Sequence, residues 1–431
     1  MRHRSLPRPA LFALLLVGTL LAAPAAATAA PSTPTLSASR VVAGDDVVAT
    51  GTVAPVAAGE LVQLEQLVDG AWTKVGQLAS TDAAGAWKVT FVPQAGGQVR
   101  ATQLSNAGGS SAEVAIEVAP RVLSAKLTGG RVYPFLGTTA TWRVAPAGYP
   151  DGPVRIDLSI DRRGAGSVRA RIVNGVVKAK LPTKGVGTFN AKLVLPARGG
   201  FVEGAATSPL SFVVRGERVG SGSSRTWNQS LRAALRFRGF HVPGGSSFDH
   251  RMGESVIAFH KAYGRARTSS FEASDWKRLT RSAVKPRYNR RGLTIEIDKS
   301  RQILMQVKNG TPTMIIHISS GATGNTPVGT HKIQWKGDWV PSLYGSLLYK
   351  SMAFQGAFAI HGYPSVPTSP ASHGCVRVPM WIAATLYRRS PVDTPVYVYE
   401  GPGGTRPSIG RAQRDVPELA GVDAARWADE G

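Results

Sequence analysis

The sequence predicts a multidomain protein that is mainly β, with one small helical region before its last β-rich segment. The chain has 431 residues, and about 400 residues left after removal of a signal peptide are too many for one hydrophobic core. Apolar and polar residues alternate along most of the chain, as they do in half-buried strands. The alternation gives way to a helical period only within residues 225–284.

The N-terminus has the three parts of a secretory signal peptide, which we assign to residues 1–29. Three arginines precede an apolar stretch over residues 11–23, and Ala27-Thr28-Ala29 is a small-x-small cleavage site. The apolar stretch is too short to favour a membrane anchor that stays in place. We therefore expect a secreted, extracytoplasmic protein with no stable membrane span after signal cleavage.

Basic residues outnumber acidic ones, with 51 Lys and Arg against 27 Asp and Glu and a formal net charge of +24. Such a charge attracts polyanions. For an exported protein these would be anionic wall polymers or lipid head groups, whereas export argues against nucleic acid. The basic residues are spread over the chain, so no binding patch is predicted, and colloidal solubility is the simpler explanation.

Residues 31–119 and 120–216 each predict a small β-sandwich module. Alternating runs flank an Asp-Gly turn at 69–70 in the first and an Asn-Gly turn at 174–175 in the second. Short strands between turn signals are typical of sandwiches. The first module resembles the immunoglobulin-like modules of bacterial surface proteins, and the second repeats the theme. We assign neither any chemistry and expect a spacer or a wall contact.

Residues 217–224 are rich in Gly and Ser and are predicted to be a flexible linker. Residues 225–284 predict helices, with Gly239 where the first should stop and Asp249 as N-cap of the second. The segment resembles the three-helix peptidoglycan-binding domain, which implies a glycan ligand. The resemblance lies in the order of its features: a helix, a Gly-Phe turn, a Phe-Asp loop, a longer helix and a Trp-x-x-Leu ending. Asp249 and His260 depart from that pattern, and an apolar helical stripe is more often core than binding site.

Residues 287–400 return to strands and contain the only cysteine of the chain, Cys375. A lone cysteine in an exported protein cannot form an internal disulfide, and nearby imidazoles can favour a reactive thiolate. A buried, unreactive thiol is the simplest alternative. A zinc site made of Cys375, His361 and His373 lacks a clear fourth ligand, so we expect no metal.

Cys375 follows a His-Gly pair and a variable loop, inside the motif Ser-His-Gly-Cys-Val-Arg. This order resembles the signature of the YkuD-type L,D-transpeptidase catalytic domain. The strand meander that begins at residue 293 and the Thr-Pro-x-Gly loop at 326–329 also resemble that family. The resemblance implies a YkuD-type β-rich catalytic domain over residues 287–400. Residues 401–431 are Pro/Gly-rich at first and are predicted to be a tail.

The resemblance also implies the site. Cys375 would be the nucleophile, His361 the general base, and the Gly362 backbone the group that orients the base, because no Asp or Glu lies between 339 and 392. Further residues of the motif are given supporting roles. His373 would help to hold the loop or polarise the site. The backbone amides of Gly374 and Cys375 would donate hydrogen bonds to the oxyanion, and Ser372 and Arg377 would bind the substrate. A structural role for Arg377 is equally open.

The implied reaction joins peptidoglycan stem peptides in 3→3 cross-links through a Cys375 thioester, with release of D-Ala and without any cofactor. The same thioester released by water would make the protein an L,D-carboxypeptidase, and the residues do not separate the two. A cysteine protease is disfavoured because no papain-like pattern surrounds Cys375. A non-catalytic wall-binding scaffold remains the alternative of a different class.

Overall fold

The computed structural model describes residues 30–105, 109–205, 209–288 and 290–401. The predicted signal peptide and all but the first residue of the predicted tail lie outside them. The described residues form strands β1–β26 and only four helices, which confirms the prediction of a mainly β protein. Among them, no helix combines the length and the hydropathy that crossing a membrane requires.

The chain forms two compact units, Met1–Pro120 with Ala197–Glu203, and Arg121–Pro196 with Gly204–Gly431. In the first unit, two sheets share one core. Their turn at 69–70 joins β5 to β6, as the Asp-Gly pair predicts. The strands are β1 (Ala30–Pro31), β2 (Thr35–Leu36), β4 (Val47–Ala54) and β7 (Ala86–Phe91) in one sheet, and β3 (Arg40–Val42), β5 (Leu61–Val68), β6 (Ala71–Ser80), β8 (Gly97–Gln103) and β9 (Val114–Ala119) in the other.

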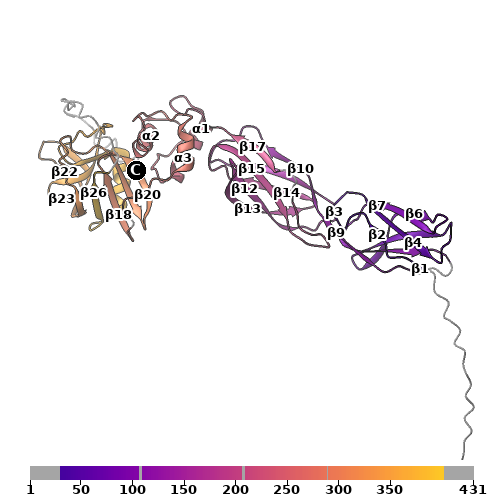
Figure 1. The fold of residues 1–431 in the computed structure, drawn as a ribbon. Helices are drawn as coiled ribbons and strands as arrows, with labels where there is room; N and C mark the ends of the chain where they lie inside the picture. The colour runs from indigo at the N-terminus through magenta and orange to yellow at the C-terminus, as the bar shows by residue number, and fades with distance from the viewer. Residues whose placement is uncertain (1–29, 106–108, 206–208, 289, 402–431) are drawn as a thin grey trace, which may run out of the picture. The chain divides into compact units, whose positions relative to one another are not determined.

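The second unit begins with one eight-stranded sheet in the order β10-β11-β14-β13-β12-β15-β16, with β17 beside β15 (Figure 1). The Asn-Gly turn at 174–175 joins β13 to β14, and these strands pair at only two positions next to it. The immunoglobulin-like character of both modules stays a prediction. The strands are β10 (Arg121–Thr128), β11 (Thr138–Ala145), β12 (Gly152–Ile160), β13 (Arg163–Val173), β14 (Val176–Leu181), β15 (Gly187–Leu195), β16 (Gly204–Ala205) and β17 (Leu210–Val214).

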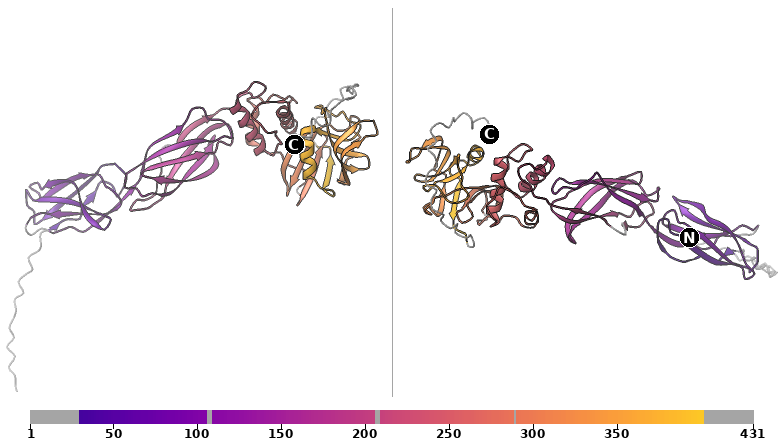
Figure 2. Two further views of the ribbon diagram at one scale, coloured as in Figure 1. Left: turned by 180° about the vertical axis from the view of Figure 1, so that it is seen from behind. Right: turned by 90° about the horizontal axis from the view of Figure 1, so that it is seen from above.

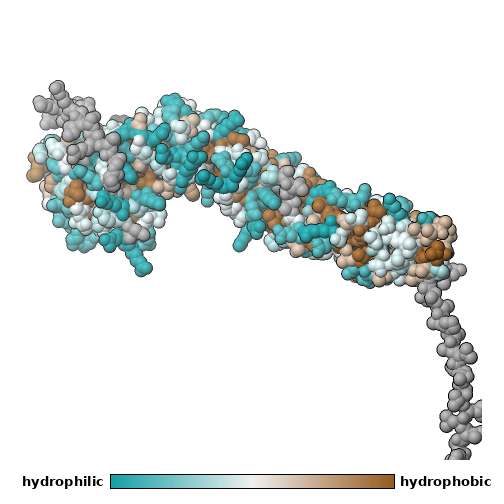
Figure 3. All heavy atoms as spheres, in the orientation of Figure 1, coloured by the Kyte–Doolittle hydropathy of each residue, from teal (hydrophilic) through white to brown (hydrophobic). Residues whose placement is uncertain are grey.

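Three helices follow, α1 (Arg225–Phe237), α2 (His250–Ala262) and α3 (Asp275–Arg281). Asp249 caps α2 by accepting a hydrogen bond from the Met252 amide at 2.9 Å, as the sequence predicts. Gly239 has φ +83°, which suits the glycine predicted just after α1. On the face drawn in Figure 3, hydrophilic residues cover much of this part of the chain.

Residues 217–224 differ from the flexible linker predicted for them. Val219 is fully buried and pairs its backbone with that of Phe271. The carbonyl of Glu217 accepts a hydrogen bond from the Trp276 indole at 2.8 Å. The glycine and serine content of the segment does not reveal these contacts, because they are made by one buried valine and by backbone groups.

The last part of the chain contains two sheets that enclose one core together with α4 (Met380–Arg389). The five-stranded sheet has the order β20-β19-β18-β26-β21, and the four-stranded sheet the order β22-β23-β24-β25. The strands are β18 (Leu293–Asp298), β19 (Ile303–Lys308), β20 (Thr311–His317), β21 (Gly329–Lys332) and β26 (Pro395–Tyr399), and then β22 (Trp335–Pro341), β23 (Leu347–Gln355), β24 (Phe358–Tyr363) and β25 (Val376–Pro379).

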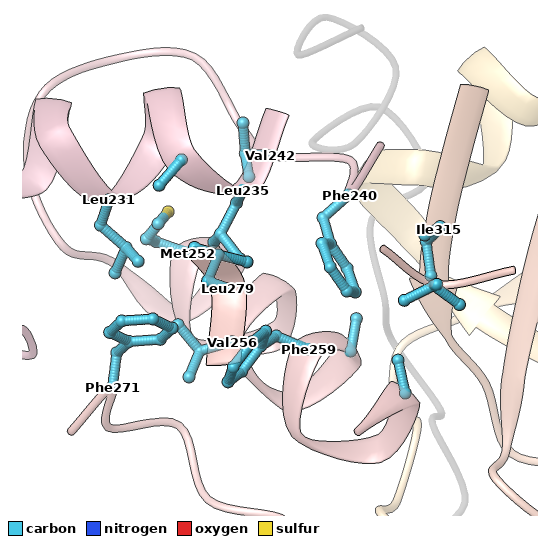
Figure 4. Packing of buried hydrophobic residues seen from close by; sticks show 14 of the residues in the cluster. Leu231, Leu235, Phe240, Val242, Met252, Val256, Phe259, Phe271, Leu279 and Ile315 are labelled. Carbon is cyan, nitrogen blue, oxygen red and sulfur yellow. The ribbon is translucent and has the colours of Figure 1, made fainter. Parts of the chain in front are cut away.

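The helices and the five-stranded sheet share a second core. Ile303, Met305 and Val307 of β19 are buried in the same cluster as the apolar side chains of α1, α2 and α3. Figure 4 shows Phe240, just after α1, close to Ile315 of β20. The further views in Figure 2 agree that the helices lie against this sheet. The helical segment (residues 225–284) therefore covers one face of the five-stranded sheet.

Replacement of Phe240 by alanine tests this shared core. Phe240 is 2 % exposed, so we expect a loss of about 3 kcal/mol of stability, and we expect the helices and the five-stranded sheet to lose stability together. Urea unfolding followed by circular dichroism and tryptophan fluorescence measures both. Leu343→Ala, at a side chain that is 85 % exposed, is the control. If the helices of Phe240→Ala unfolded at a lower urea concentration while the unfolding of the five-stranded sheet stayed unchanged, a common core would be contradicted.

Candidate active site

The pairing of β24 with β25 brings the two parts of the sequence motif together. The strands run parallel, with His361 opposite Arg377. Cys375 directly precedes β25, so its side chain comes next to the strand that carries His361. Parallel neighbours need a crossover, and residues 364–375, here named the Cys loop, supply it. The predicted catalytic pair thus depends on backbone pairing within the four-stranded sheet.

His361 is held as a neutral imidazole with a defined orientation. Its ring is 2 % exposed, and Nδ1 donates to the Gly362 carbonyl oxygen at 3.0 Å. Burial, with a smaller contribution from the positive charge of Arg377, lowers the pKa of His361 to about 4, although the hydrogen bond to Gly362 acts in the opposite direction. With the proton on Nδ1, Nε2 is left as a hydrogen-bond acceptor.

Cys375 is partly buried and carries a protonated thiol in this arrangement. Burial raises the pKa of the thiol, while the Ala359 backbone hydrogen bond and the charge of Arg377 act in the opposite direction. The thiol donates to the Ala357 carbonyl at 3.6 Å. Within the described part of the chain, no hydrogen bond joins Cys375 and His361, so the pair is at rest as a thiol and a neutral imidazole.

A pocket of about 830 Å³ contains most of the residues predicted for the site. Its walls include five Trp, Tyr and Phe side chains, and no Asp or Glu lines it. The predicted residues that line it are His361, Gly362, Ser372, His373, Cys375 and Arg377, and the aromatic ones are Trp335, Trp339, Tyr344, Phe358 and Tyr363. The structure therefore brings together six of the seven predicted residues in this pocket, and Gly374 is not among its lining residues.

Gly374 differs from its predicted role as an oxyanion donor. Its amide donates to Ser372 Oγ at 3.0 Å, and the same hydroxyl donates to the Cys375 carbonyl at 2.5 Å. Gly374 has φ +130°, and a Cβ there would lie 2.4 Å from the Phe358 ring. The residue is thus required for backbone shape, while its amide is occupied by the serine hydroxyl.

Arg377 and His373 lie in different environments. The Arg377 guanidinium is buried and lies 4.2 Å from the Tyr363 ring centre. Among the described residues it has no acidic partner within ion-pair distance, so its charge faces the pocket uncompensated. His373 is exposed and stacks on Tyr344, with ring centres 4.0 Å apart. His373 thus lies at the rim of the pocket, away from the buried imidazole.

Asn325 and Thr326 also hold the Cys loop, a role that the sequence analysis did not assign to them. Asn325 Nδ2 donates to the His373 carbonyl at 2.8 Å. Thr326 Oγ1 donates to the Gly374 carbonyl at 2.7 Å. Both belong to the predicted Thr-Pro-x-Gly loop or adjoin it, so the motif was a signal for this contact.

In the described ranges, no group of three or more His, Cys, Asp or Glu residues could hold a metal ion.

The buried histidines predict how stability depends on pH. Burial lowers the pKa of His241, His317 and His361 to about 4, whereas an unfolded histidine titrates near 6.5. Between these values the unfolded chain binds more protons, so stability is complete above pH 6.5 and is lost as the pH falls towards 4. We expect at least about 2 kcal/mol less stability at pH 5 than at pH 7. Urea unfolding at both pH values measures this, and equal midpoints would contradict it.

Comparison with protein families gives one match, to YkuD, the L,D-transpeptidase catalytic domain, over residues 292–398. No curated protein matches the chain.

The solved structures that match the chain include several L,D-transpeptidases. One from Xylanimonas cellulosilytica is 27% identical, covers 44% of this chain and 99% of its own, and has a TM-score of 0.40. One from Stackebrandtia nassauensis is 20% identical, covers 45% and 100%, and has a TM-score of 0.30. A third, from Mycobacterium smegmatis, is 13% identical, covers 65% and 99%, and has a TM-score of 0.23.

Proposed function

Because residues 292–398 are a YkuD-type L,D-transpeptidase catalytic domain, we propose that the protein is a secreted enzyme that forms 3→3 cross-links in peptidoglycan. Cys375 forms the thioester, and D-Ala is the leaving group. The observation that carries this proposal is the common pocket of Cys375, His361 and Arg377. The wall is then the place of action, and anionic wall polymers are possible further contacts for a chain of net charge +24.

The geometry supports a two-step acyl transfer. The Nε2 atom of His361 takes the thiol proton as Cys375 Sγ attacks the carbonyl of the third stem residue. The peptide bond to D-Ala breaks, and the imidazolium returns the proton to the leaving amine. A side-chain amine of a second stem then attacks the thioester and gives a proton to His361. The C–S bond of the thioester breaks as the new amide bond forms, and the imidazolium returns its proton to the Cys375 thiolate.

Two groups of the pocket support charge development in this reaction. The charge of Arg377 favours the Cys375 thiolate. The Cys375 amide donates to no acceptor in the ranges that the structure describes, which leaves it as the candidate oxyanion donor. An uncompensated guanidinium and the lack of acidic walls also favour peptides that carry carboxylates, as stem peptides do.

Mass spectrometry of the full chain incubated with disaccharide-tetrapeptide tests the proposal. Cross-linked dimer with loss of D-Ala, absent in Cys375→Ala, is the expected result. Tripeptide without dimer would favour the L,D-carboxypeptidase, in which water takes the place of the acceptor amine. No turnover would contradict both enzymes and favour a wall-binding scaffold. Glycan binding by the helical segment stays a prediction.

A further inference from the structure

The helical segment touches the Cys loop directly through Arg267. Arg267 lies after α2, is half-buried, and its Nη1 donates to the Thr368 carbonyl at 2.5 Å. Its Nη2 donates to the Ser300 carbonyl at 3.5 Å. Thr368 lies midway along the Cys loop, whose far end is Cys375. A side chain of the helical segment therefore holds the crossover that delivers the thiol.

Lys261 of α2 makes a second contact on the same region. Its ammonium group is buried and donates to the Ile318 carbonyl at 2.7 Å. The next residue, Ser319, exchanges two backbone hydrogen bonds with Arg377, at 2.9 and 3.1 Å. The Ser319 hydroxyl also donates to the Ser369 carbonyl at 2.7 Å. Lys261 thus fixes the strand end that holds the Cys loop on both sides of the thiol.

Stability alone does not explain these two side chains. The shared apolar core already attaches the helical segment to β19 and β20. A buried ammonium group is costly to desolvate, and an apolar side chain of similar volume is often as stable or more stable. Lys261 is 2 % exposed, and burial lowers its pKa well below the usual value. What the two donors add over apolar residues is directional hydrogen bonding to chosen carbonyls.

We propose that Arg267 and Lys261 are positioning residues, by which the helical segment holds the Cys loop so that Cys375 meets His361. Neither residue lines the pocket, so neither touches the substrate. The catalytic part of this inference rests on the proposed function, whereas the ordering of the Cys loop does not. The helical segment then positions the Cys loop, in addition to the wall contact predicted for it.

Arg265 provides a matched control. It lies in the same loop as Arg267 and pairs with Asp275 at 3.1 Å, inside the helical segment. Its removal therefore disturbs the helical segment without breaking a contact to the Cys loop. Arg267→Lys is the conservative variant, because a lysine keeps one donor for the Thr368 carbonyl.

Hydrogen exchange of the full chain, read on peptides that cover residues 364–375, tests the inference. Arg267→Met is expected to raise their exchange at least about tenfold, and Arg265→Met to leave it unchanged. With disaccharide-tetrapeptide, Arg267→Met should lower kcat about tenfold with KM nearly constant, and Arg267→Lys should recover part of the loss. Lys261→Met is expected to act in the same direction.

Exchange and kcat in Arg267→Met equal to those in Arg265→Met would overturn the inference, since both variants would then act only through the helical segment. A wild-type chain without turnover would overturn the proposed function. The exchange difference would still decide whether Arg267 orders the Cys loop, so the two failures are distinct.

Discussion

Cys375→Ala is expected to lower D-Ala release from tetrapeptide at least about a thousandfold, because the nucleophile of the covalent step is gone. The fold should survive. The side chain is only partly buried, and the hydrogen bond that its thiol donates is long, 3.6 Å to the Ala357 carbonyl. We expect a change of less than about 1 kcal/mol in the free energy of unfolding. Release of D-Ala and urea unfolding, measured on one preparation, check both statements.

Cys375→Ser is the control for this prediction. Its hydroxyl keeps the size and a hydrogen-bond donor but is a far weaker nucleophile, so the loss of activity should be similar. Full activity in Cys375→Ala would remove Cys375 from the mechanism. If Cys375→Ala does not fold, the activity of Cys375→Ser decides the role of Cys375 instead.

His361→Gln is expected to lower kcat by about a thousandfold, since His373, the other histidine among the lining residues, is exposed at the rim. Glutamine can keep a polar contact near the Gly362 carbonyl but cannot accept and return the thiol proton. His373→Gln is the matched control, because His373 is exposed at the rim and stacks only on Tyr344. We expect less than a tenfold loss there. Equal losses in both variants would contradict the assignment of His361 as the base.

The same assignment sets the acid side of the pH profile. Burial lowers the pKa of His361 to about 4, so Nε2 stays free to accept a proton over the whole neutral range. Activity should therefore fall as the pH decreases through about 4, whereas an ordinary histidine would impose a fall near 6.5. Initial rates between pH 4 and 7, with the enzyme checked for folding at each pH, measure the difference.

Local signals of the sequence predict local structure well. The Asp-Gly, Asn-Gly and helix-cap positions all appear where expected, because a turn or cap depends on a few adjacent residues. The His-Gly and Ser-His-Gly-Cys motifs also contain five residues that line the pocket, namely His361, Gly362, Ser372, His373 and Cys375. Each of these signals is contained in a short run of the chain.

Features that depend on distant partners are not visible in the sequence. Ile303, Met305 and Val307 look like one face of a half-buried strand, but β19 is buried on both faces because helices from 225–284 pack on it. The Gly374 amide looks free, yet the nearby Ser372 hydroxyl occupies it. Arg267 gives no signal at all, since its partner is a backbone carbonyl, and any residue type can supply one.

Peptide mapping of the acyl group after acid quench is the most direct test of the central claim, that Cys375 carries the substrate as a thioester. With wild-type enzyme and disaccharide-tetrapeptide, the account predicts that the peptide containing Cys375 gains the mass of the donor without D-Ala. Hydroxylamine should remove this mass, and Cys375→Ala should lack it. Turnover with the acyl group on any other residue, or with no acyl group on the Cys375 peptide, would contradict the account.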